Sequence, residues 1–248
     1  MDVVYTIWLR NVKRFVRSKS RIVGSLGMPF FFLLILGFGL NNALDIPNVE
    51  SYLSFLAPGI VAMTILFASI FSGIQVVWDK QFGFLKETMV APVSRLAIMI
   101  GQTLGGATVA LIQGGLIFVI SLGLGVSIQS VGGVLLAALF MVLIGLCFTA
   151  MGVAAASRME DMQGFQFIMN FVIFPIFFLS GALFPLEGLP SWLQGLTYID
   201  PLTYGVQGIR YGVLGVADIS PVISLIVLGT FTAAMLGFGA YMFRKIRL

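Results

Sequence analysis

The side chains that most often perform chemistry in proteins are scarce in this sequence, and they form no cluster. Histidine is absent and the single cysteine, Cys147, lies in an apolar run, so the chain offers no His/Cys metal site and no internal disulfide framework. The ten carboxylates form no recognisable acid–base pair, and no Gly-x-x-x-x-Gly-Lys-Ser/Thr segment is present to hold ATP. We expect no catalytic residue, metal or cofactor site in this chain.

The charged residues are gathered into a few islands, and the stretches between them are apolar. Hydrophobic residues make up 59% of the chain and charged residues 10%, and the mean hydropathy is +1.05. A bilayer core of about 30 Å needs about 20 apolar helical residues. A polar break at residues 127–130 divides the longest stretch in two. We expect an all-α membrane protein forming one domain over residues 1–248, with six spans at 22–44, 53–78, 97–126, 131–156, 163–186 and 220–243.

The basic residues predict the orientation of these spans. With six spans, all of the 14 lysines and arginines except Arg210 fall on one side of the membrane. Basic residues concentrate on the cytoplasmic side. We therefore expect a multi-pass protein of the cell membrane with both termini in the cytoplasm.

Polar residues within the predicted spans are neutral, which disfavours a proton- or ion-coupled carrier because such carriers need ionisable groups at membrane depth. An amide in a span most often bonds to a neighbouring helix. The amides of Gln75, Gln166 and Asn170 could instead contact a transported molecule. Phe174 and Phe178 could form an aromatic wall for an amphipathic molecule or could face lipid, and Pro175 is expected to kink the fifth span. Gly101 and Gly105 predict a close helix approach.

Three segments outside the spans have helical patterns of their own, at residues 1–21, 79–95 and 187–219. Residues 1–21 place a basic face opposite an aromatic one, which suits a helix in the headgroup plane. In the cytoplasmic connection 79–95, a short helix with Phe82, Leu85 and Met89 exposed could dock on a partner protein or dip into the lipid interface. Pro92 ends that helix, and Ser94 can cap the next.

The external connection, residues 187–219, predicts two short helices before the last span. One covers residues 190–196, and the other opens at Asp200-Pro201, because Asp as N-cap followed by Pro is a strong helix start. The second helix is apolar but shorter than a span. We expect it to be re-entrant, dipping partway into the outer leaflet while packed against protein.

Two motifs resemble the signatures of ABC-2-type permeases. Ala91-Pro92-Val93-Ser94-Arg95 resembles that family's Pro-Ile-Ser-Arg region, with Val93 in place of the commoner Ile. Residues 177–185, followed by Pro201-Leu202-Thr203-Tyr204 and Arg210, resemble its C-terminal signature. The resemblance extends over essentially the whole chain and is greatest to daunorubicin-type drug-resistance permeases.

This resemblance implies the membrane half of an ATP-driven exporter for a hydrophobic or amphipathic substrate such as a drug, an antibiotic or a lipid-like molecule. A separate ATP-binding cassette subunit would bind ATP and Mg, and a second permease subunit, identical or paralogous, would complete the pathway. It further implies three groups of site residues. They are the ATPase-coupling residues Phe82, Leu85, Lys86, Glu87, Met89, Pro92 and Arg95; the substrate-pathway residues Gln75, Gln166, Asn170, Phe174 and Phe178; and the external-lid residues Pro185, Pro201, Tyr204 and Arg210.

Two other functions remain open at this point. The chain could export a polysaccharide or a lipid-linked glycan, since polysaccharide-export permeases are the next most similar group. It could also be a membrane scaffold of the same fold that transports nothing, in which case the ATP turnover of its partner would not respond to a cargo. A self-sufficient channel is disfavoured by the absence of charge in the spans.

Overall fold

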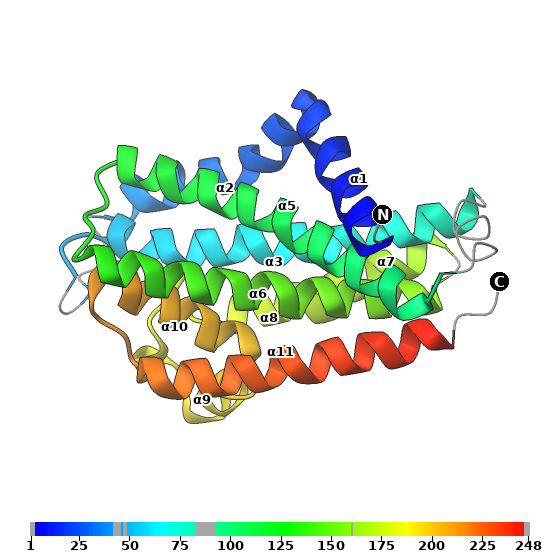
Figure 1. The fold of residues 1–248 in the computed structure, drawn as a ribbon. Coiled ribbons are helices and arrows are strands. Elements are labelled where there is room, and N and C mark those ends of the chain that lie inside the picture. The colour runs from blue at the N-terminus through cyan, green and yellow to red at the C-terminus, as the bar shows by residue number, and fades with distance from the viewer. Residues whose placement is uncertain (1–2, 42–45, 47–48, 83–92, 160, 246–248) are drawn as a thin grey trace.

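The protein is described here from a computed structural model, which covers residues 3–41, 46, 49–82, 93–159 and 161–245. The described chain folds into helices joined by turns and short connections. Six helical segments are long and apolar enough to cross a membrane, and they lie side by side in one elongated bundle (Figure 1). This confirms the predicted all-α class with six candidate spans. The segments are α2 (Lys19–Gly39), α3 (Tyr52–Gln81), α5 (Arg95–Gly123), α6 (Val131–Arg158), the run α7–η1–α8 (Met162–Leu179) and α11 (Pro221–Arg244).

Helix α3 is the centre of the bundle. It packs against α2, α5, α6 and α10 (Pro201–Leu214), and most of its residues are buried. Close approach to α6 depends on a glycine, since a Cβ on Gly152 would lie only 2.9 Å from the Ile70 carbonyl oxygen. The same applies to the contact between α6 and α10, where a Cβ on Gly212 would lie 2.5 Å from the Gly133 carbonyl oxygen. Backbone-to-backbone packing therefore holds α3, α6 and α10 together.

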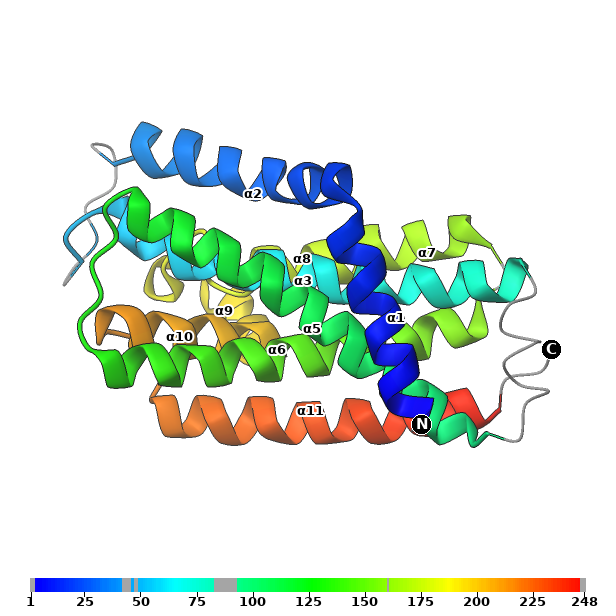
Figure 2. The same ribbon diagram turned by 45° about the horizontal axis from the view of Figure 1, so that its top comes forward.

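Helix α1 (Val3–Arg17) crosses α5 at a steep angle and does not run along the bundle (Figure 2). Only Ser18 separates it from α2. Its buried residues are Ile7 and Phe15, and Asn11 lies between them on the same face, because residues four apart share one side of a helix. The aromatic face that the sequence predicted is divided: Phe15 is buried, whereas Tyr5 and Val16 are exposed.

The fifth span is interrupted. Helix α7 (Met162–Ile168) continues as a π-helical segment, η1 (Met169–Ile173), and then as α8 (Phe174–Leu179). Pro175 explains the interruption, because its ring would clash with a carbonyl one turn earlier and it has no N–H to donate. The N–H of Phe174 bonds instead to the Met169 carbonyl, five residues back. The helical run ends at Leu179, short of the expected residue 186, because the chain turns at Gly181 with a φ of +70°.

The connection before the last span contains the two expected helices. After a short 3-10 turn, η2 (Leu186–Gly188), come α9 (Ser191–Thr197) and α10. The Asp200 carboxylate accepts a hydrogen bond from the Leu202 N–H at 2.8 Å, which confirms the start that Asp200-Pro201 predicted. Helix α10 packs against α3, α6 and α11, with most of its side chains buried.

Candidate functional site

A cavity of about 540 Å³ lies among α1, α2, α3, α5 and the α7–η1–α8 run. It is partly enclosed by helices that the sequence could not place next to one another. Apolar and aromatic side chains form most of its wall, including Phe67, Phe71 and Phe165. Arg21 is the one charged residue among the described residues that line it.

The structure brings most of the predicted pathway residues together at this cavity. Gln75 of α3, Gln166 of α7, Asn170 of η1 and Phe174 of α8 all line it. Phe174 also meets Phe67 edge to face, with ring centroids 5.3 Å apart. Phe178 is not part of the lining: it is exposed and stacks on Phe174.

The polar groups that face the cavity differ in whether they already have partners. The hydroxyls of Ser25, Ser72 and Thr64 each donate to a carbonyl of their own helix. The Gln75 Nε2 group is buried and has no hydrogen-bond partner among the described residues. A buried amide donor without a partner is unfavourable, and Gln75 is one of the residues that line the cavity.

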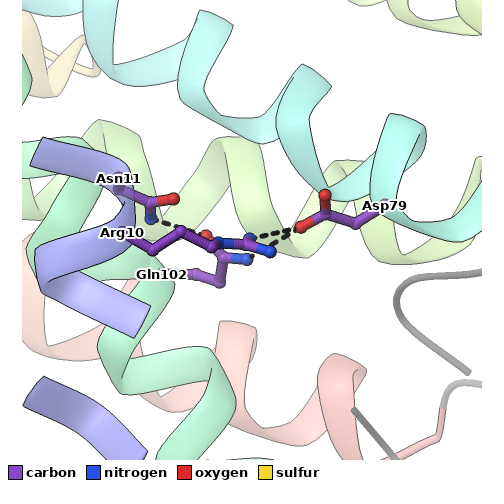
Figure 3. A network of polar contacts seen from close by, with 4 residues as sticks. All are labelled: Arg10, Asn11, Asp79 and Gln102. Atoms are coloured by element: carbon purple, nitrogen blue, oxygen red, sulfur yellow. Dashed lines mark hydrogen bonds and ion pairs between the residues drawn. The ribbon is translucent and has the colours of Figure 1, made fainter. Parts of the chain in front are cut away.

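At one end of the cavity, polar side chains join α1 to α3 and α5. Figure 3 shows Arg10 and Asn11 of α1, Asp79 of α3 and Gln102 of α5 pointing toward one another. Arg10 Nη2 lies 2.5 Å from Asp79 Oδ2, and Asn11 Nδ2 donates to Gln102 Oε1 at 2.7 Å. Gln102 Nε2 reaches the same Asp79 oxygen at 3.4 Å. We call these four residues the α1 network.

The α1 network explains two features of the sequence. Asp79 was placed in a connection, but α3 continues to Gln81, so this carboxylate sits buried in the last turn of a helix. The close approach predicted at Gly101 and Gly105 is made by α1, since a Cβ on Gly101 would lie 2.9 Å from Ile7 Cβ and one on Gly105 2.6 Å from Asn11 Nδ2.

The predicted coupling residues lie at the same end of the bundle as far as the structure describes them. Phe82 follows the last residue of α3 and is 83% exposed. Arg95 begins α5 and donates to the Arg244 carbonyl at 2.8 Å, and Ser94 caps α5 through the Ala97 N–H as predicted. Leu85, Lys86, Glu87, Met89 and Pro92, and with them the predicted coupling helix, lie outside the described residues.

The predicted lid residues lie at the ends of short helices or inside the bundle. Pro185 precedes η2, and Pro201 is the first residue of α10. The buried Tyr204 hydroxyl donates to the Tyr198 carbonyl at 2.7 Å, which ties α10 to the end of α9. Arg210 is 2% exposed; its Nη2 donates to the Gly181 carbonyl at 2.9 Å, and its guanidinium lies 3.8 Å from the centre of the Phe55 ring.

Burial shifts the pKa of two groups in this region. It raises the pKa of the Asp200 carboxyl to about 7, although the bonds from Leu202 and Thr203 act in the opposite direction. It lowers the pKa of the Arg210 guanidinium to about 10, and the nearby Asp218 carboxylate opposes that change. Among the described residues, no three His, Cys, Asp or Glu side chains gather to hold a metal ion.

Comparisons with known proteins agree with this geometry. Residues 2–214 match the family model described as ABC-2 type transporter. The chain is 29% identical over 232 residues to the inner membrane transport permease YadH of Escherichia coli strain K12, covering 92% of this chain and 90% of YadH. It is 31% identical over 212 residues to nodulation protein J of Rhizobium leguminosarum bv. trifolii, covering 84% of this chain and 80% of that protein.

Proposed function

Because the chain belongs to the ABC-2 type transporter family and is therefore a membrane transport permease, we propose that it is the membrane-spanning subunit of an exporter whose ATP is hydrolysed by a separate subunit. The sequence carries no P-loop of its own, which is consistent with an ATPase partner. We further propose that two permease subunits work together in one complex at the cell membrane.

The proposed class of transported molecule is inferred from the lining of the cavity. An aromatic and aliphatic wall with a few neutral amides binds apolar or amphipathic molecules by excluding water, and the amides orient them. Gln75, Gln166 and Asn170 supply these amides, and the buried Gln75 Nε2 has no partner among the described residues. These features support export of a hydrophobic or amphipathic molecule, such as a drug or a lipid-like compound.

The proposed coupling to ATP runs through the end of the bundle where α3 ends. Phe82 is a large exposed apolar side chain there, and it is the first residue of the predicted coupling helix. An exposed apolar side chain of this kind fits a groove on a partner protein. Movement of the partner on ATP binding would then shift the end of α3, and the α1 network would carry α1 and α5 with it.

The first test is copurification of the tagged chain from its native membranes, with mass spectrometry of the proteins that accompany it. We expect an ATPase with a P-loop to accompany the wild type and to be lost with Phe82→Asp. The matched control is Val131→Asp, because Val131 is 82% exposed but lies at the start of α6, at the opposite end of the bundle. Loss of the ATPase with both variants, or with neither, would contradict the proposed docking role of Phe82.

The second test separates transport from a scaffold role. The purified complex is reconstituted in liposomes, and its ATP turnover and its uptake of the amphipathic dye Hoechst 33342 are measured together. We expect the dye to stimulate turnover several-fold and Asn170→Leu to raise the dye concentration needed. A rate of ATP turnover that is unchanged by this dye and by a panel of lipids and drugs would favour a non-transporting scaffold.

A further inference from the structure

The bend between α1 and α2, which we call the elbow, forms a basic groove. This groove is separate from the cavity of about 540 Å³ described above. It has a volume of about 860 Å³ and is lined by Arg10, Lys13, Arg14, Arg17, Ser18, Lys19 and Ser20. The four α1 residues are spaced three and four apart, so they share one face of that helix. The bend at Ser18 brings the first residues of α2 against this face. We call this set of residues the basic groove.

The charge of the groove is largely uncompensated within the described part of the protein. Arg10 is paired with Asp79, outside the groove lining. Lys13, Arg14, Arg17 and Lys19 make no hydrogen bond or ion pair with any described residue, and no acidic residue lines the groove. Like charges held this close repel one another, and a bound anion removes that cost.

The donors in the groove suit a phosphate group. Arginine side chains present paired N–H groups that match phosphate oxygens, and the hydroxyls of Ser18 and Ser20 can add further donors. Ser18 makes no side-chain cap bond to α2. The backbone N–H groups of the first turn of a helix have no partner within the helix and favour an anion at that end.

The position of the groove identifies the kind of molecule that would carry the phosphate. It lies where the α2 candidate span begins, and apolar side chains flank it, since Val16 is 56% exposed and Val23 72% exposed. Phe15 and Arg21 of the same elbow line the cavity of about 540 Å³. Cations next to apolar side chains at the start of a span meet phospholipid headgroups.

We propose that the basic groove is a binding site for a phosphate-bearing headgroup carried by an anionic membrane amphiphile. The site differs from general attraction between a basic protein and an acidic membrane, because it depends on these particular residues and not on net charge. Binding there fixes the elbow, and so positions α1 against α5 at the α1 network.

The test uses the full-length protein in detergent and native mass spectrometry with two lipids of identical acyl chains, dioleoylphosphatidylglycerol and dioleoylphosphatidylcholine. We expect the anionic lipid to bind about 100-fold more tightly, which corresponds to about 1 kcal/mol for each of three cations. The triple variant Lys13→Gln, Arg14→Gln, Arg17→Gln should reduce its affinity to that of the zwitterionic lipid.

The matched control removes three positive charges elsewhere. Arg158, Arg244 and Lys245 are exposed and lie outside the groove, so Arg158→Gln, Arg244→Gln, Lys245→Gln should keep the preference for the anionic lipid. Equal loss in both triple variants would show a diffuse effect of net charge and would overturn the proposal, as would equal binding of the two lipids by the wild type. If the groove triple variant does not fold, Arg14→Gln alone should weaken anionic-lipid binding about 5-fold.

A further arm separates the two sources of phosphate. Glycerol 3-phosphate is added as a soluble competitor, and we expect it to displace the lipid only at concentrations far above that of the lipid. Displacement at equal concentrations would assign the groove to soluble phosphate compounds and would overturn the membrane part of the proposal. Because no ATPase is present in this experiment, its failure would leave the proposed transport function standing.

Discussion

At the scale of single residues, Asp79 is the most informative position in the molecule. A carboxylate at the end of a largely apolar helix is costly to bury unless a cation and hydrogen-bond donors compensate its charge. Arg10 and Gln102 provide both, and they come from two other helices. The pair is therefore as much a link between elements as a local contact.

Replacing either Arg10 or Asp79 should destabilise the protein. Replacing both should lower the free energy of unfolding by less than the sum of the two single effects. We expect Asp79→Asn or Arg10→Gln to lower the melting temperature in detergent by about 5 °C, corresponding to about 2 kcal/mol, because each removes the ion pair between α1 and α3 in a partly buried place. The double variant should be about 1 kcal/mol more stable than the sum of the two single losses predicts. Arg158→Gln, at an exposed residue, is the control. Strictly additive effects would show that the pair contributes no coupling between α1 and α3.

At the scale of elements, α1 stays in place because α5 offers a surface without side chains at Gly101 and Gly105. We expect Gly105→Val to push α1 away, since its Cβ alone would lie 2.8 Å from Asn11 Cβ. The cost should be about 1–3 kcal/mol, and trypsin should cut after Lys13 and Arg14 at least about 10-fold faster, because local opening controls cleavage.

The same helix contains a control for this prediction. A Cβ on Gly115 would meet no atom within 4 Å, so Gly115→Val should change stability by no more than about 0.5 kcal/mol and leave the cleavage rate unchanged. If Gly105→Val behaved like Gly115→Val in both measurements, the seam between α1 and α5 would not be what holds α1.

These elements also show which features of the fold could be predicted from the sequence. The six spans and the starts at Ser94 and Asp200 were predictable, because hydropathy and capping depend on residues close together in the chain. Arg10 and Asp79 are 69 residues apart, and no local pattern pairs a given cation with a given carboxylate. Which face of α1 packs against α5 was not predicted, for a related reason. The apolar face of α1 can be recognised from the sequence, but its contact with α5 depends on Gly101 and Gly105, which lie against Ile7 and Asn11.

At the scale of the whole molecule, the helices differ in how firmly they are held. Helix α3 is the most buried of the six candidate spans, whereas α2, α7–η1–α8 and α11 are the least buried. The cavity of about 540 Å³ lies between α3 and two of these outer elements, α2 and the α7–η1–α8 run. We expect the outer helices to move relative to α3, α6 and α10 when the cavity opens and closes, because those three are in backbone contact.

The predicted orientation can be checked with single cysteines in a Cys147→Ala background, since Cys147 is buried. In intact cells, a membrane-impermeant maleimide should label Val131→Cys and Trp192→Cys, both at highly exposed positions. Ser20→Cys, in the basic groove, should react only after the cells are permeabilised. The reverse pattern would place both termini outside and contradict the orientation that the basic residues predict.

The long sequence separation of the contacts of α1 has a consequence for biosynthesis. Asn11 bonds to Gln102, 91 residues later, and Trp8 to Thr108, 100 residues later. At about 5–20 residues per second, the ribosome needs on the order of 10 s to supply those partners. During that interval α1 has no α5 to pack on, and we expect its aromatic and basic faces to let it rest on the membrane surface. We therefore expect the amphipathic character of α1 to matter first in the nascent chain, and in the finished bundle only after the third span has been inserted.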